Sequence, residues 1–132
     1  MARFIINGQD INVEQVNETA EQVIVLLHGF TGSTATWTHV VKHLPTWRIV
    51  TVDLMGHGKS AAPEEVAAYS MERQTDVLEA LFQQLNLEKI VLLGYSMGGR
   101  VALSYTAKYP GRVQQLILES ASPGLRSDEE RA

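Results

Sequence analysis

The sequence KIVLLGYSMGGRVALSYTAKY, at residues 89–109, decides the fold class. Residues 89–94 form a short apolar run of branched side chains, which is typical of a strand covered on both faces in a parallel sheet. Helical spacing follows over residues 97–109 and ends at Pro110-Gly111. A buried strand that passes directly into a helix predicts one unit of an α/β fold.

Segments of the same character occur along the rest of the chain. Three further apolar runs predict strands at residues 22–27, 47–53 and 112–119. Helical spacing occurs between strands at residues 36–44 and 71–86. Short runs at residues 3–6 and 10–15 flank Asn7-Gly8, which is a strong hairpin signal. We therefore predict an α/β fold with a mostly parallel sheet and helices on both faces.

The composition is that of one soluble domain. The chain has 132 residues, of which 45% are hydrophobic and 20% charged, and its net charge is -4. Since there is no basic excess to bind phosphates, we expect no nucleic-acid partner. The absence of cysteine excludes disulfides and thiolate metal sites. No signal peptide or long apolar segment is evident, so we expect a cytoplasmic protein without a membrane partner.

The chemistry centres on Gly94-Tyr95-Ser96-Met97-Gly98, a G-x-S-x-G sequence between a predicted strand and a predicted helix. This context indicates a nucleophile elbow, in which a strained turn presents Ser96 at the sheet edge. We predict that Ser96 is catalytic and that the backbone N–H of Met97 is one oxyanion donor. The alternative is a glycine-rich turn that merely contains a serine.

Glycine-rich loops also follow two other predicted strands, which favours a site at the carboxyl edge of the sheet. In the first, LHGF at residues 27–30, the N–H of Phe30 is the predicted second oxyanion donor. His28 is either a catalytic base or a brace that hydrogen-bonds to backbone, and we favour the brace.

The second loop is DLMGHGKS at residues 53–60. Asp53 is either a triad acid or a structural residue, and we favour a structural role for both Asp53 and His57. His39 and His43 have the spacing of two metal ligands on a helix, but no third ligand is evident. We predict no metal site.

In their order along the chain, LHGF, DLMGHGKS and GYSMG resemble the motifs of the α/β-hydrolase superfamily, and the resemblance covers nearly the whole chain. GYSMGGR (residues 94–100) and LILESASPGLRSDEERA (116–132) are similar to the 2-succinyl-6-hydroxy-2,4-cyclohexadiene-1-carboxylate synthase family of menaquinone biosynthesis. The resemblance implies a cofactor-free lyase that eliminates pyruvate from 2-succinyl-5-enolpyruvyl-6-hydroxy-3-cyclohexene-1-carboxylate. Ser96 would be the triad-activated base in that reaction.

The same resemblance gives Arg100 and Tyr95 roles in binding the polycarboxylate substrate. Arg100 lies one helical turn after Ser96, where a guanidinium can hold a carboxylate through two hydrogen bonds. The alternative for Arg100 is an ion pair with an acidic neighbour on the helix surface.

Two members of a serine triad are missing from this chain. In this superfamily the order is serine, acid, histidine, whereas the last histidine here is His57. The carboxylates after Ser96 are those of Glu119, Asp128, Glu129 and Glu130. We therefore expect residues 1–132 to be the N-terminal part of a single core domain, truncated before the lid and the last strands, and inactive alone.

Two other functions stay open. In one, the parent protein is an esterase or C–C hydrolase with Ser96 as its nucleophile. In the other, the chain is a non-catalytic, self-associating fragment, because residues 112–119 would form an exposed sheet edge.

Overall fold

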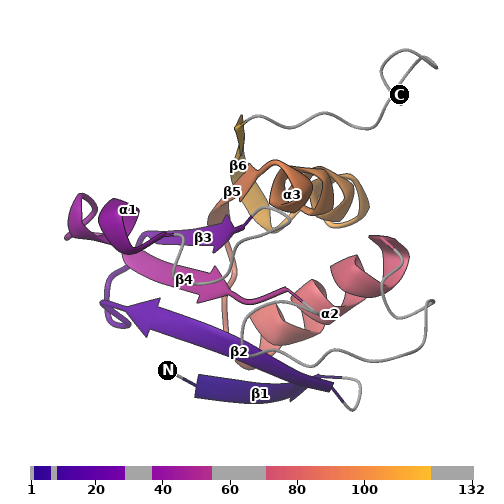
Figure 1. Ribbon diagram of the computed structural model, residues 1–132, viewed down its shortest axis with the longest axis horizontal. Coiled ribbons are helices and arrows are strands. Elements are labelled where there is room, and N and C mark those ends of the chain that lie inside the picture. The colour runs from indigo at the N-terminus through magenta and orange to yellow at the C-terminus, as the bar shows by residue number, and fades with distance from the viewer. Residues whose placement is uncertain (1, 7–8, 29–36, 55–70, 120–132) are drawn as a thin grey trace.

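The computed structural model describes residues 2–6, 9–28, 37–54 and 71–119 (Figure 1). The strands in these ranges are β1 (Ala2–Ile6), β2 (Gln9–Val16), β3 (Val23–Leu27), β4 (Arg48–Val52), β5 (Ile90–Tyr95) and β6 (Val113–Glu119). The helices are α1 (Thr38–Lys42), α2 (Met71–Gln84) and α3 (Met97–Lys108). Each element lies where the apolar runs and helical spacing predict one.

All six described strands form one sheet, in the order β1-β2-β4-β3-β5-β6. The hairpin strands β1 and β2 are antiparallel to each other, and β2 is antiparallel to β4. The other pairs, β4 with β3, β3 with β5 and β5 with β6, are parallel. The mostly parallel α/β sheet predicted from the sequence is therefore confirmed.

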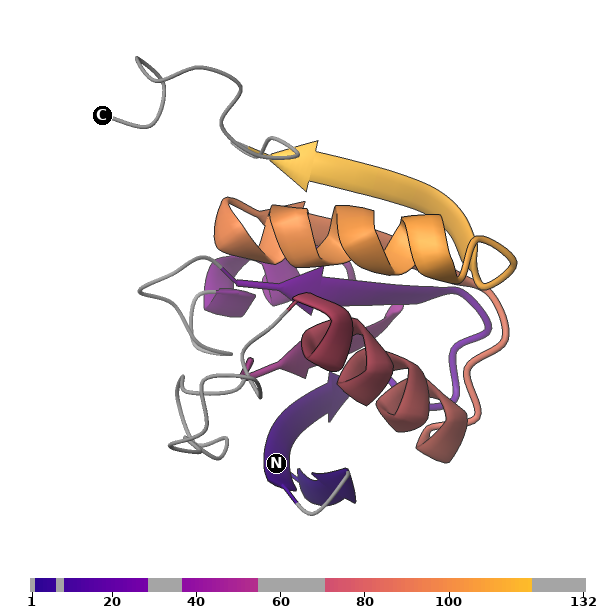
Figure 2. The ribbon, with the colours of Figure 1, turned by 90° about the vertical axis from the view of Figure 1, so that its right-hand side faces the viewer.

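Helices cover both faces of this sheet. Figure 2 shows α2 and α3 side by side across one face, with β6 at one border and the hairpin at the other. Their buried side chains pack against Val25 and Leu27 of β3. On the opposite face, Trp37 and α1 cover Ile24 and Leu26. Because successive side chains of β3 point to opposite faces, all five of its residues are buried, as a continuous apolar run predicts.

The edge strand β6 is much less covered than β3. None of its seven residues is buried. A register shift opposite Ile90 and Val91 leaves Gln114 as an extra residue, because Val113 pairs with Ile90 and Gln115 with Val91. The strand then runs in regular register to Glu119.

None of the described helices is long and apolar enough to cross a membrane.

Candidate active site

Ser96 forms the junction between β5, which ends at Tyr95, and α3, which begins at Met97. Its backbone has φ 54° and ψ −114°. A positive φ is strained for a residue with a side chain, and such strain recurs at functional sites. The backbone therefore has the sharp, strained strand-to-helix turn that the G-x-S-x-G sequence predicts.

The two glycines of the motif are required by close backbone approach. A Cβ atom at Gly94 would collide with the backbone of Gly98 and Gly99 at the start of α3. A Cβ at Gly98 would collide with the carbonyl groups of Leu27 and His28 at the end of β3. The motif thus allows α3 to begin directly against two neighbouring strands, so that Ser96 is held at their carboxyl ends.

Backbone hydrogen bonds fix the elbow on both sides. The N–H of Ser96 donates to the carbonyl of Glu119 at the end of β6, at 2.9 Å. The Ser96 carbonyl accepts from the N–H groups of Gly99 and Arg100, at 3.0 and 3.2 Å. Met97 is the first residue of α3, so its N–H has no acceptor within the helix. That N–H belongs to the positive end of the helix dipole, which favours negative charge near the elbow.

Arg100 lies one turn along α3 from Ser96, and its side chain is exposed. Within the described ranges its guanidinium makes no hydrogen bond or ion pair. An ion pair with an acidic neighbour, the alternative raised by the sequence, is therefore not found there. Tyr95, on the other side of Ser96, is also exposed, at 40%. A tyrosine and a guanidinium without a partner in the described part of the chain thus flank the elbow.

His28 follows β3 and is fully buried. Its Nε2 accepts the backbone N–H of Leu54, which follows β4, at 2.9 Å. The structure therefore supports the brace rather than the catalytic base for His28. Phe30 and His57, the predicted oxyanion donor and second loop histidine, lie outside the described residues.

Asp53 is buried beside that brace and contacts a residue that sequence reasoning missed. Its Oδ2 accepts from the side-chain amide of Asn12 in β2 at 2.8 Å, and its N–H donates to the Asn12 carbonyl at 3.0 Å. These bonds tie the hairpin to the end of β4, which is a structural role for Asp53. The glycine turn that Asp53 was predicted to hold lies outside the described residues. Asn12 could have been flagged only as a polar residue between the apolar Ile11 and Val13.

A second polar cluster at the other end of α3 was also not predicted. The Glu79 carboxylate of α2 accepts from the Tyr105 hydroxyl at 2.7 Å and from two nitrogens of Arg112 at 2.8 and 3.1 Å. Burial acts to raise the pKa of Glu79, but the hydrogen bonds from Arg112, Tyr105 and Gln83 outweigh it and lower that pKa. Burial and the Glu79 carboxylate raise the pKa of Tyr105. This cluster joins α2, α3 and the start of β6.

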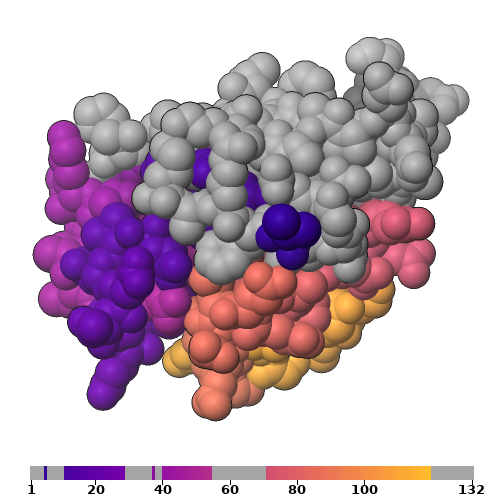
Figure 3. Space-filling model, turned by 90° about the horizontal axis from the view of Figure 1, so that it is seen from below, coloured from indigo at the N-terminus to yellow at the C-terminus, as the bar shows by residue number. Residues whose placement is uncertain are grey.

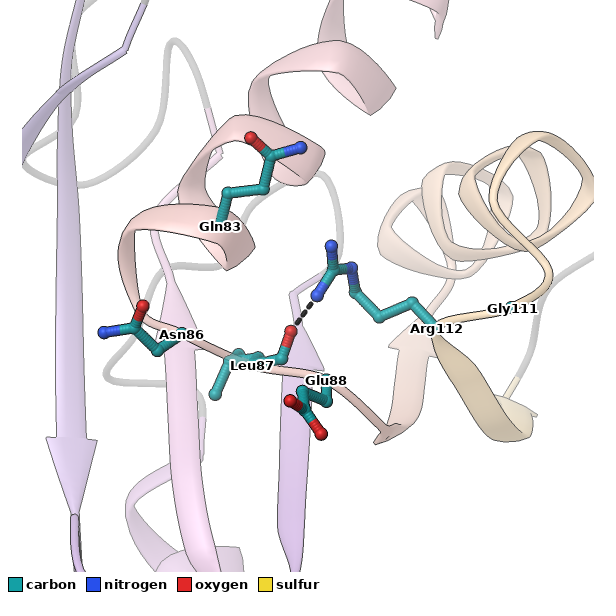
Figure 4. Close-up of a pocket in the computed structure, with 6 residues that line it drawn as sticks. All are labelled: Gln83, Asn86, Leu87, Glu88, Gly111 and Arg112. Atoms are coloured by element: carbon teal, nitrogen blue, oxygen red, sulfur yellow. Dashed lines mark hydrogen bonds between the residues drawn. The ribbon is translucent and has the colours of Figure 1, made fainter.

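An open hollow of about 490 Å³ lies beside this second cluster. Figure 4 shows Arg112 donating to the Leu87 carbonyl, with Gln83, Asn86 and Glu88 around it. A second hollow, of about 310 Å³, opens between the start of β3 and the turn before β5 (Figure 3). Both hollows lie at the amino ends of the parallel strands, whereas Ser96 lies at the carboxyl ends. They are therefore separate from the elbow.

Comparison with known proteins places these features in context. A family model described as "alpha/beta hydrolase fold" matches residues 22–131. The putative 2-succinyl-6-hydroxy-2,4-cyclohexadiene-1-carboxylate synthase of Bacillus subtilis (strain 168) is 43% identical over 127 residues, which cover 96% of this chain and 46% of that protein. The 2-succinyl-6-hydroxy-2,4-cyclohexadiene-1-carboxylate synthase of Klebsiella pneumoniae is 35% identical over 108 residues, or 82% of this chain and 42% of that protein.

A solved structure from Nitrososphaera gargenis, described among carboxylesterases, superposes with a TM-score of 0.86 at 26% identity. The match covers 94% of this chain and 46% of that one. The chain therefore spans less than half the length of each of these three proteins.

Proposed function

The chain belongs to the α/β-hydrolase fold family, and from this premise we propose that it is the serine-bearing part of a pyruvate-eliminating lyase. The proposed substrate is 2-succinyl-5-enolpyruvyl-6-hydroxy-3-cyclohexene-1-carboxylate, an intermediate of menaquinone biosynthesis. The observation that carries the proposal is that Arg100, one turn beyond the strained Ser96, has no ion-pair partner among the residues that the structure describes. The similarity to two proteins that bear the synthase name supports the same reaction.

In the proposed reaction Ser96 acts as a base. Its oxygen removes a proton from a ring carbon, and the electron pair left behind forms a new ring double bond while the existing ring double bond shifts by one position. The C–O bond between the ring and the enolpyruvyl oxygen breaks at the same time, and the enolate that leaves takes up a proton on carbon to become pyruvate. The N–H groups of Met97 and Phe30 would stabilise the enolate-like oxygen charge that develops, as they would in acyl transfer.

Arg100 supplies the selectivity for a substrate rich in carboxylates. A guanidinium is permanently charged and can donate two parallel hydrogen bonds to one carboxylate. Because no protein carboxylate holds Arg100 within the described residues, the substrate has no intramolecular pair to displace there. Tyr95 would line the same pocket, beside the reacting serine.

The isolated chain is proposed to be inactive. A serine hydroxyl becomes an effective base only when a histidine accepts its proton. His28 uses its Nε2 to hold the Leu54 N–H, so that nitrogen is not available to Ser96. No histidine follows Ser96 in the sequence. The missing acid and histidine would come from the part of a longer protein that the relatives have and this chain lacks.

A chimera tests the lyase directly. The 127 matching residues of this chain would replace their counterpart in the Bacillus subtilis protein, whose remaining part supplies the other half of the fold. We expect this chimera to release pyruvate from the proposed substrate, and Ser96→Ala to lower kcat by at least about 1000-fold. Ser104→Ala, on the same helix, is the matched control and should retain activity. A folded chimera that releases no pyruvate would contradict the proposal.

A hydrolase is the second candidate function. It is supported by the elbow geometry, which suits a covalent nucleophile equally well, and by the similarity to a structure described among carboxylesterases. The same chimera distinguishes the two: turnover of simple esters without pyruvate release would favour the hydrolase. Labelling of Ser96 by a serine-directed phosphonate would occur in either case.

The chain is also proposed to associate with itself through the exposed edge of β6, whether or not the parent protein is a lyase.

A further inference from the structure

The first turn of α3 rests directly on backbone at the end of β3. Gly98 lies in this turn, two residues after Ser96. A Cβ atom added to Gly98 would collide with the carbonyl groups of Leu27 and His28. Because Gly98 has no side chain to separate the two backbones, a shift of the His28 backbone would pass directly to the elbow. The position of Ser96 therefore depends on what holds Leu27 and His28 in place.

Strand pairing holds Leu27 but does not extend to His28. Leu27 pairs with Val52 of β4 on one side and with Gly94 of β5 on the other, and each is the last pair of its ladder. His28 is one residue beyond both ladders. Its buried ring provides a contact there instead, since Nε2 accepts the N–H of Leu54 at 2.9 Å. This side chain continues the attachment of β3 to β4 past the end of the paired strands.

The donor of this hydrogen bond is itself held in place through its neighbour Asp53. The Asp53 N–H donates to the Asn12 carbonyl at 3.0 Å, and the Asp53 carboxylate accepts from the Asn12 side-chain amide at 2.8 Å. Asn12, Asp53 and Leu54 are all buried. A continuous set of contacts thus runs from β2 through the end of β4 and the His28 ring to the start of α3.

We propose that His28 is a positioning residue for Ser96. Its ring fixes the backbone on which the first turn of α3 rests, and so determines how well the serine oxygen and the Met97 N–H are placed for reaction. In this role His28 acts through the backbone and transfers no proton. The inference rests on Ser96 being the reactive group of the proposed function, but it applies to a lyase and to a hydrolase alike.

The hydrogen bond specifies which atoms the ring must present. Nε2 can accept the Leu54 N–H only when it carries no proton, so the proton of the neutral ring is on Nδ1. Glutamine at position 28 can place its side-chain oxygen near the position of Nε2 and keep an acceptor there. Methionine has a similar length but offers only a weak acceptor, and would leave the buried Leu54 N–H poorly satisfied. His28→Gln and His28→Met are therefore a matched pair.

The first test measures how fast a serine-directed phosphonate labels Ser96 in the chimera described above. The serine oxygen forms a bond to phosphorus while the leaving group departs, so the rate reports the reactivity of Ser96 whatever the natural substrate is. We expect His28→Met to lower the second-order rate constant about 100-fold, as a displacement of about 1 Å can do, and His28→Gln to restore most of it. In pyruvate release, the loss should appear in kcat and not in KM.

The control separates positioning from a general loss of stability. Arg112→Met also removes a partly buried interaction, but at the other end of α3, and should keep the wild-type labelling rate while folded. An unchanged rate in His28→Met, or an equal loss in Arg112→Met, would overturn the proposal. A wild-type chimera that is labelled but releases no pyruvate would contradict the lyase alone. A folded chimera that is not labelled would contradict both.

The second test needs no variant and no activity. Nitrogen-15 NMR of the 132-residue chain distinguishes protonated from unprotonated ring nitrogens, and His28 is assigned through its backbone resonances. We expect an unprotonated Nε2 and a protonated Nδ1 at neutral pH. A charged ring, or a proton on Nε2, would overturn the proposal, because the Leu54 N–H would then have no acceptor on that nitrogen.

Discussion

The two ends of helix α3 differ in how their polar groups are held. At the C-terminal end, Arg112 is bound by both oxygens of Glu79, which also accepts from Tyr105. At the N-terminal end, Ser96 has a strained backbone and Arg100 has no partner within the described residues. The same helix thus carries a satisfied polar cluster at one end and an unsatisfied one at the other.

This difference separates residues that stabilise the fold from residues that are available to a ligand. Removing one member of a hydrogen-bonded, partly buried pair leaves its partner unsatisfied and lowers stability. An exposed, unpaired guanidinium adds little to stability, and backbone strain subtracts from it. Arg112 is therefore interpreted as a residue that stabilises the fold and Arg100 as one that is available to a ligand, because only Arg112 has protein partners among the described residues.

The largest expected effect on stability comes from adding a side chain at Gly98, where α3 begins against the end of β3. Gly98→Ala should lower the free energy of unfolding by about 3 kcal/mol, because its Cβ meets the backbone of Leu27 and His28 rather than a movable side chain. Gly111→Ala is the control, since nothing lies within 4 Å of its added Cβ. Urea unfolding at one protein concentration compares the two variants. Equal stability would show that β3 and α3 are not in such close contact.

The next largest effect on stability is expected at Arg112, and substitution of Arg100 provides the direct comparison. Arg112→Met should lower the free energy of unfolding by about 2 kcal/mol, between the values for exposed and for fully buried ion pairs. Arg100→Met should change it by less than about 0.5 kcal/mol, as for other surface substitutions. Urea midpoints measure both changes. A large loss of stability at Arg100 would mean that its guanidinium has a structural partner.

A smaller effect of opposite sign is expected at the elbow itself. Ser96→Gly should raise the free energy of unfolding by about 1 kcal/mol, because glycine adopts a positive φ without the strain imposed by a Cβ. Ser104→Gly, in the interior of the same helix, should lower it by about 0.5 kcal/mol. Thermal or urea unfolding shows whether each variant is more or less stable than the wild type. A loss of stability at both positions would argue against stored strain at Ser96.

The smallest expected effect on stability concerns the charge of Glu79 and appears only at acidic pH. The pKa of Glu79 is lowered in the folded chain from its ordinary value of 4.5, so its ionised form stabilises the fold above that pH. This contribution is lost as the pH falls through the folded-state pKa. The stability difference between wild type and Arg112→Met should therefore be constant near neutral pH and shrink below about pH 4.5. A difference that stays constant down to pH 3 would show that the carboxylate charge does not matter.

Local sequence patterns predict most of the fold and the centre of the site. The apolar runs and the G-x-S-x-G motif place β5, Ser96 and α3 because each of these signals lies within a few consecutive residues. The pairs of polar side chains that hydrogen-bond to each other are not predicted by such local signals. Arg112 lies 33 residues from Glu79, and Asp53 lies 41 residues from Asn12. Which carboxylate reaches which donor depends on how the helices and strands pack, so no spacing rule identifies these pairs.

The bulge in β6 is another feature that the sequence does not signal. Residues 112–119 predict a strand, but nothing in VQQLILE marks Gln114 as the extra residue. The bulge arises from the pairing of β6 with β5, so it depends on contacts between two strands and not on the local sequence of β6.

The central claim is that Arg100, which has no partner within the described residues, binds a carboxylate of the substrate. It is tested most directly by kcat/KM for pyruvate release in the chimera that supplies the missing half of the fold. Arg100→Met, a variant expected to keep its stability, should lower kcat/KM at least about 100-fold, since a charged hydrogen-bonded pair contributes roughly 3 kcal/mol. An unchanged kcat/KM would contradict the claim.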